Sequence, residues 1–178
     1  MKVLLGLGLL LGAVPLSGAL AEDRAACGKG LICASDPQTV VKALQEAGYK
    51  AKLTADKLGD PMVESAASGY EFEILFYGCE SKRRCDSLQF YRGFEAGVEN
   101  TPAYANKWNV KNRFVQMAAH PDTTLSVHHD VSTIGGLTKA NFADTVEWWA
   151  SQLNEMRTFF RENDPAKPTA ARAGPTAN

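Results

Sequence analysis

The chain has 178 residues, a length that suggests a single domain, and its net charge is −1. This near-neutral balance argues against nucleic acid or another acidic polymer as a partner, because such partners select strongly basic surfaces. The sequence carries no internal repeat, long charge run or catalytic fingerprint, so it indicates fold and compartment more clearly than activity.

The N-terminus has the three parts of a secretory signal peptide. Lys2 precedes an apolar run that ends at Val14, and small residues follow up to the A-x-A pattern Ala19-Leu20-Ala21. The run is short for a bilayer span, so an uncleaved membrane anchor is the less favoured alternative. We therefore expect cleavage after residues 1–21, no membrane span in the product, and a periplasmic or secreted location.

Four cysteines form two similar pairs, Cys27 with Cys33 and Cys79 with Cys85, and each pair encloses five residues. An even cysteine count in an exported chain indicates two disulfides. Sequence leaves three connectivities open, and we favour local pairing. Zinc ligands usually have two or four residues between cysteines and redox motifs have two, so both alternatives fit less well than a structural staple.

The chain then alternates between helical and strand patterns. Helices are expected at 37–47, from Thr101-Pro102 onward, and at 139–162. Strands are expected at 51–54, 62–67, 70–77, 86–94, 113–119 and 124–131. The pattern predicts an α+β fold of order α-β-β-β-β-α-β-β-α with an antiparallel sheet.

The last helix should pack on this sheet. Its apolar residues recur at steps of three and four: Phe142, Val146, Trp149, Leu153, Met156 and Phe160. The strand at 70–77 has one strongly apolar face, and each apolar face can cover the other. We divide the mature chain into a short leader with the first cysteine pair (22–35), the α+β domain (36–162) and a tail expected to be disordered (163–178).

Several stretches resemble the YbjN domain family of bacterial proteins, and together they cover roughly 36–160. They are VVKALQEAGYKAKL (40–53), YEFEILFYGCESKRRCDSLQF (70–90), ANKWNVKNRFVQM (105–117) and GGLTKANFADTVEWW (135–149). The resemblance implies a fold similar to that of type III secretion chaperones, which often dimerise and bind other polypeptides. It also implies a role as a sensory transduction regulator, and it brings no catalytic residues.

Two features are candidate partner contacts. Lys82, Arg83 and Arg84 lie at the tip of the hairpin that the second cysteine pair brackets, where they are either a solvated turn or a contact for an anion or a partner. Trp148 neighbours the core-facing Trp149, so it is expected to be partly exposed and to mark an interface.

Other polar clusters are weaker candidates. His128 and Asp130 share one strand face, with His129 on the other and His120 across the hairpin. A metal site is one interpretation of this cluster, and polar residues on an open sheet face are the favoured one. Glu71 and Glu73 also share a face, as a pair of acid–base carboxylates would, although the wet side of an amphipathic strand is the simpler interpretation.

These observations favour an exported, non-enzymatic binding module without a cofactor, whose partner is another polypeptide or a second copy of itself. A small-ligand sensor, with a pocket between the last helix and the sheet, is the first alternative. A metal-dependent enzyme that uses His128 and Asp130 is the least favoured one.

Overall fold

The structure is a computed structural model that describes residues 26–163. The expected signal peptide, and the expected disordered tail after its first residue, lie outside the described residues. The element order is α1 (Pro37–Glu46), β1 (Ala51–Ala55), β2 (Pro61–Ala67), β3 (Tyr70–Tyr77), β4 (Ser87–Phe94), α2 (Pro102–Asn109), β5 (Gln116–Ala119), β6 (Leu125–Ser132) and α3 (Lys139–Glu162). The predicted α+β class and element order are therefore confirmed.

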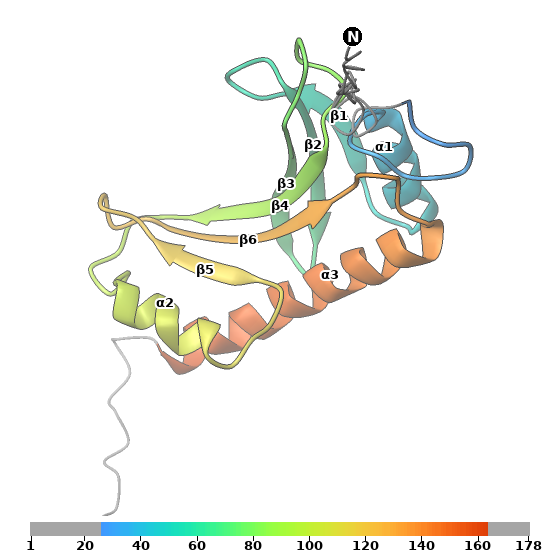
Figure 1. Cartoon of the computed structure of the whole chain (residues 1–178). Coiled ribbons are helices and arrows are strands. Elements are labelled where there is room, and N and C mark those ends of the chain that lie inside the picture. Colours follow the sequence, from blue (N-terminus) through green and yellow to red (C-terminus); the bar gives the residue numbers. More distant parts are fainter. Residues whose placement is uncertain (1–25, 164–178) are drawn as a thin grey trace, which may run out of the picture.

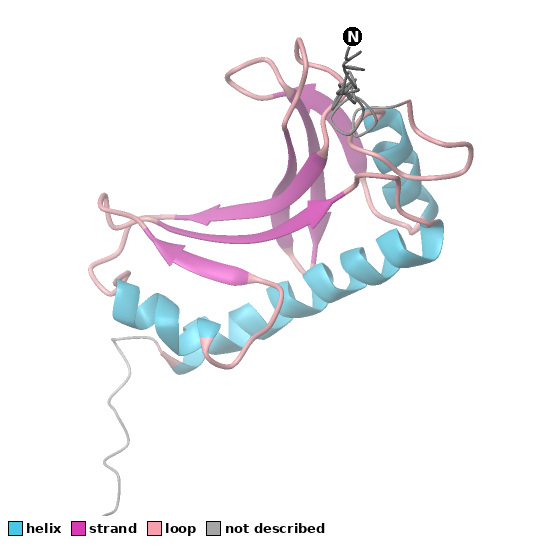
Figure 2. Cartoon of the chain, viewed as in Figure 1, coloured by secondary structure: helices cyan, strands magenta, loops and turns pink. Residues whose placement is uncertain are grey.

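The strands form one antiparallel sheet of order β1-β2-β3-β4-β6-β5. Helix α3 runs along the sheet, α1 lies beside β1 at one end, and α2 lies beside β5 at the other (Figure 1). The sheet is strongly bent, so β1, β2 and β3 run at a steep angle to β5 (Figure 2). One face of the sheet is buried against the helices, and the other is left open.

Helix α3 supplies the centre of the core. The predicted stripe faces the sheet, and five of its members are almost fully buried: Phe142, Val146, Trp149, Leu153 and Met156. The ring of Trp149 lies 5.7 Å from both Phe72 on β3 and Phe90 on β4, measured between centroids. A single tryptophan therefore packs against two neighbouring strands.

The turn between β2 and β3 rests on α3. The Ser68 hydroxyl donates a hydrogen bond of 2.7 Å to the Ala150 carbonyl, and the Arg157 guanidinium donates to the Ser68 carbonyl. These contacts hold the lower end of the β2–β3 hairpin against the helix, while β4 runs on toward β6 and β5 (Figure 1).

Strand β5 begins later than the sequence indicated. The expected strand at 113–119 is wrong for its first three residues, because Phe114 has φ +69° and this left-handed conformation cannot continue an extended strand. The last helix matches the expected 139–162, and Thr138 caps it by accepting a hydrogen bond from the Asn141 amide.

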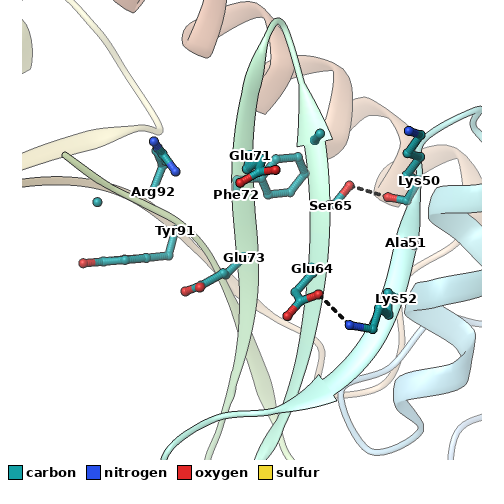
Figure 3. A pocket seen from close by; sticks show the side chains of 12 residues that line it. Lys50, Ala51, Lys52, Glu64, Ser65, Glu71, Phe72, Glu73, Tyr91 and Arg92 are labelled. Carbon is teal, nitrogen blue, oxygen red and sulfur yellow. Dashed lines mark hydrogen bonds and ion pairs between the residues drawn. The ribbon is translucent and has the colours of Figure 1, made fainter. Parts of the chain in front are cut away.

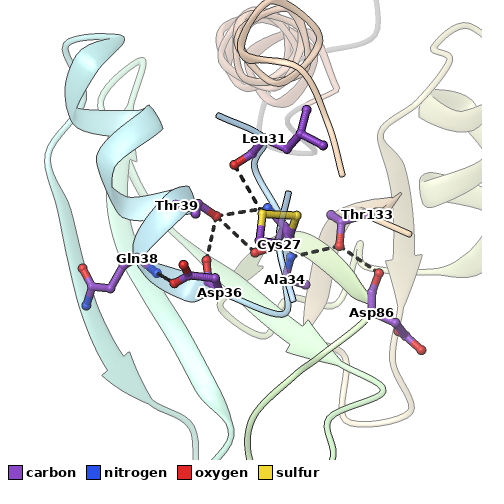
Figure 4. Close-up of a disulfide and its surroundings, with 9 residues drawn as sticks. Cys27, Leu31, Ala34, Asp36, Gln38, Thr39, Asp86 and Thr133 are labelled. Carbon is purple, nitrogen blue, oxygen red and sulfur yellow. Dashed lines mark hydrogen bonds between the residues drawn. A yellow bond between two sulfur atoms is a disulfide. The ribbon is translucent and has the colours of Figure 1, made fainter. Parts of the chain in front are cut away.

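The leader packs onto the domain. Ile32 and Leu137 exchange two backbone hydrogen bonds of 2.9 Å across an isolated bridge. The buried Thr133 hydroxyl accepts from the Ala34 amide and donates to the Asp86 carbonyl, at 2.9 Å each (Figure 4). This network connects the leader, the β3–β4 loop and the β6–α3 loop at one end of the molecule.

Candidate functional site

A groove opens in the sheet where β3 and β4 part. The two strands are paired from Tyr77↔Ser87 to Glu73↔Tyr91 and no further. Beyond this point β3 remains paired with β2, and β4 remains paired with β6. The resulting opening, which we call the β3–β4 groove, has a volume of about 720 Å³.

Charged side chains of both signs line the β3–β4 groove. Glu71, Glu73, Tyr91 and Arg92 come from the two parting strands, and Figure 3 shows them around the opening. Toward the β1 edge, the Lys52 ammonium lies 3.2 Å from the Glu64 carboxylate. In the described chain, Glu71 and Glu73 make no ion pair, so two acceptor groups remain available to a ligand.

Arg92 is unusual because its strand position faces the core. It is cross-strand neighbour to the buried Val127, and its guanidinium lies 5.5 Å from the centre of the Phe94 ring. Its Nε atom is buried, and no described group hydrogen-bonds to it. A buried donor without a partner is costly, so this atom indicates an incomplete polar site.

A chain of polar side chains crosses the open face beside the groove. The Tyr77 hydroxyl donates to Gln89 Oε1 at 3.3 Å, and Gln89 Nε2 donates to Asp130 Oδ1 at 2.8 Å. Partial burial raises the pKa of Tyr77, and the negative charge of Asp130 raises this pKa further. The hydrogen-bond partner of Asp130 in this chain is thus the neutral amide of Gln89.

The histidines do not assemble with Asp130. His120 Nε2 lies 2.8 Å from the Ser126 hydroxyl, and His129 Nδ1 lies 2.9 Å from the Phe114 carbonyl oxygen on the other face of the sheet. His128 lies on the open face, opposite Tyr91. Over residues 26–163 no three His, Cys, Asp or Glu side chains are arranged to hold a metal ion.

Each expected cysteine pair lies at disulfide distance. The two Sγ atoms are 2.18 Å apart in Cys27–Cys33 and 2.04 Å apart in Cys79–Cys85. Cys33 and Cys85 are buried and line one small hollow of about 250 Å³. Two such pairs point to an oxidising, extracytoplasmic environment.

The basic hairpin tip is less uniform than the sequence suggested. Arg84 forms an ion pair with Glu80 at 2.8 Å, and the Lys82 side chain lies over Gly59 in the β1–β2 turn. The Arg83 side chain is exposed and makes no ion pair with any described residue. Only Arg83 is therefore presented freely to solvent.

A second exposed surface lies where α3 meets the start of β5. Trp148 is 41% exposed and Phe114 is 49% exposed, and their ring centroids are 5.4 Å apart. The Arg113 guanidinium lies 5.2 Å from the centre of the Phe114 ring. We call Trp148, Phe114 and Arg113 the aromatic patch.

The left-handed backbone at Phe114 is fixed by its neighbours. His129 contacts the Phe114 carbonyl at 2.9 Å, and the Val115 amide donates to the Arg113 carbonyl at 2.8 Å. A bulky residue with positive φ is strained, and strain of this kind gathers at functional sites.

Sequence reasoning identified Trp148 and missed Phe114 and Arg92. A signal existed for Arg92, because the alternation of Leu88 and Phe90 places it on the buried face of its strand. No local pattern marks Phe114, because its left-handed backbone is contacted by His129, which lies 15 residues further along the chain.

In residues 26–163, no helix has the length and apolar character needed to cross a membrane.

The fold defines the chain as a bent antiparallel sheet covered on one face by helices. Residues 36–162 match the YbjN family, described as "Putative bacterial sensory transduction regulator", and the chain belongs to this family. No curated protein sequence matches the chain.

The solved structures that are similar to this chain include the following two. The crystal structure of YbjN from E. coli, described as a "putative transcription regulator", is 15% identical with a TM-score of 0.50 and covers 72% of this chain and 95% of its own. An uncharacterised protein from Methanothermobacter thermautotrophicus is 16% identical with a TM-score of 0.48 and covers 70% and 96%. At these identities the E. coli protein supports the fold alone.

Proposed function

We propose that the chain is an exported, non-enzymatic binding module that contacts another polypeptide through the aromatic patch. The observation that carries this proposal is the contact between Phe114 and Trp148, two large rings left exposed beside a well-packed core. Tryptophan and arginine are enriched among residues that dominate interface energies. A regulatory role within the family agrees with such a contact.

Arg83 on the stapled tip is a second proposed contact. It is held on a short loop closed by the Cys79–Cys85 pair, so its position is restricted before a partner arrives. A homodimer is the alternative occupant of these surfaces, and self-association at high concentration distinguishes it from a separate partner.

We further propose that the mature protein is periplasmic or secreted and begins near Glu22. The signal-peptide pattern and the two cysteine pairs support this assignment. Intact-mass measurement of the protein from the exported fraction tests it. A mass that includes residues 1–21 would contradict it.

Photo-crosslinking in the native compartment tests the polypeptide contact. A photo-reactive residue at position 148 or 83 is expected to capture one dominant partner, whereas the same residue at Ile134, an exposed apolar position in the β6–α3 loop, is not. Trp148→Ser should remove capture at position 83 with only a small change in the melting temperature. Equal capture at position 134, or no capture at 148, would count against the proposal.

A further inference from the structure

We propose that the β3–β4 groove binds a small zwitterionic molecule, an α-amino acid or a short peptide, with its ammonium against Glu71 and Glu73 and its carboxylate against Arg92. This inference is independent of the polypeptide contact at the aromatic patch, because the two surfaces share no residue.

The shape of the groove suits a small molecule. Its volume of about 720 Å³ falls in the range of ligand sites, which is about 300–1,000 Å³. The groove occurs where an otherwise continuous ladder stops at Glu73↔Tyr91, so residues 70–72 of β3 and 92–94 of β4 lack one another as strand partners. Backbone groups on two facing strand edges are thereby available to a ligand.

The acidic side of the groove calls for a cation. Glu64 is already paired with Lys52, but Glu71 and Glu73 are not paired with any described residue. Tyr91 stands directly opposite Glu73 across the ladder, and its ring lies along β4 toward Gly93 (Figure 3). The two carboxylates match an ammonium group, which they would bind through charge-assisted hydrogen bonds.

The basic side calls for an anion. Arg92 lines the same groove, and its buried Nε lacks a hydrogen-bond partner among the described residues. A guanidinium presents donors in a planar fork that fits a carboxylate. A purely cationic ligand would leave Arg92 unsatisfied, and a purely anionic one would leave Glu71 and Glu73 uncompensated. A zwitterion satisfies both sides.

The test is an NMR titration of the isotope-labelled exported protein. The probes are the standard L-amino acids, added singly, the dipeptide L-alanyl-L-alanine, and the uncharged analogue N-acetyl-L-alanine methylamide. At least one zwitterionic probe is expected to shift the amide resonances of residues 70–73 and 91–93, and the uncharged analogue is not. A response to amino acids alone or to the dipeptide alone identifies which of the two the groove takes.

Variants test the role of each charge. Arg92→Gln and the double variant Glu71→Gln/Glu73→Gln should each weaken binding about tenfold or more, because each loses a charge-assisted hydrogen bond. Arg92→Lys keeps the positive charge and should bind with intermediate affinity. Glu147→Gln, on the exposed face of α3, is the matched control and should bind like the parent protein.

The melting temperature of each variant shows whether it folds. If Arg92→Gln does not fold, the intermediate affinity expected of Arg92→Lys still tests the role of Arg92. The inference is overturned if no zwitterionic probe shifts these resonances at millimolar concentration. It is also overturned if the uncharged analogue binds equally well, or if the double variant binds as the parent does.

Discussion

The Asn109 side chain makes two hydrogen bonds with the backbone of Met117. Its Oδ1 accepts from the Met117 amide at 2.8 Å, and its Nδ2 donates to the Met117 carbonyl at 3.0 Å. Next to this pair, Trp108 Nε1 donates to the Val115 carbonyl at 2.9 Å. Helix α2 thus occupies the outer edge of β5, where another strand could otherwise pair.

Asn109→Ala should lower the free energy of unfolding by about 1–2 kcal/mol and increase self-association, because it frees the β5 edge. Denaturant unfolding and light scattering measure the two effects. Asn109→Asp keeps the acceptor for the Met117 amide but loses the donor to the Met117 carbonyl. Its stability and its self-association should therefore lie between those of the parent protein and those of Asn109→Ala. If Asn109→Ala stays monomeric and equally stable, the edge is protected by other groups.

The strain at Phe114 is measurable by comparing two substitutions. Phe114→Gly and Phe114→Ala both remove the ring, but only glycine adopts φ +69° without cost. The glycine variant should therefore be more stable than the alanine variant by about 1 kcal/mol. Equal stabilities would show that the backbone relaxes when the ring is removed.

The adjacent tryptophans should respond in opposite ways. Trp149 is fully buried and packs on Phe72 and Phe90, so Trp149→Ala should cost about 3–5 kcal/mol of folding free energy. Trp148 is 41% exposed, and Trp148→Ala should cost less than about 1 kcal/mol. Denaturant melts of both variants provide the comparison. A large loss in Trp148→Ala would make it a core residue and weaken its assignment to an interface.

Acid should weaken the contact between α1 and α3. The hydrogen bond from Lys139, 2.7 Å long, lowers the pKa of Glu46 below its ordinary value of 4.5. Because the folded-state pKa is the lower one, this stabilisation is present above pH 4.5 and is lost as pH falls through the folded-state pKa. The melting temperatures of the parent and of Glu46→Gln should therefore converge as the pH is lowered below 4.5. Curves that stay parallel over this range would contradict the contact.

The double variant Cys79→Ser/Cys85→Ser should fold but with a lower melting temperature. Closing a loop this short contributes about 2–2.5 kcal/mol in the chain-entropy model. Thermal unfolding under non-reducing conditions measures the difference. Adding reductant to the parent protein should lower the melting temperature at least as far, because it opens Cys27–Cys33 as well. Loss of binding with unchanged stability would show that the pair has a role beyond that of a staple.

Much of the fold was predictable because its signals are local. The alternation of Phe72, Ile74 and Phe76 on β3 and the stripe around Trp149 on α3 follow directly from burial on one face. Thr101 and Thr138 cap their helices through side chains that accept from Tyr104 and Asn141 amides, as their sequence positions suggested.

The groove could not be predicted, because it depends on where a ladder stops. The residues of β3 and β4 alternate regularly through Glu73 and Tyr91, and nothing in either strand announces that pairing ends there. The cause is tertiary: the Ser68 turn is anchored to α3 while β4 follows β6 around the bend.

The packing of the leader was not predicted either. The sequence led us to treat residues 22–35 as separate from the domain, although Ile32 is buried against it.

One turn of α3 connects the two proposed binding surfaces through Phe72, which lines the groove and contacts Trp149. Trp149 contacts Phe72 on β3 and Phe90 on β4, the two strands that part at the groove, and the next residue back in the chain is Trp148 of the aromatic patch. A ligand that favours one separation of β3 and β4 would change how Trp149 packs on Phe72 and Phe90. Because Trp148 lies in the same helical turn, its position at the surface would change as well. By thermodynamic reciprocity, a partner bound at Trp148 would then change the ligand's affinity by the same factor.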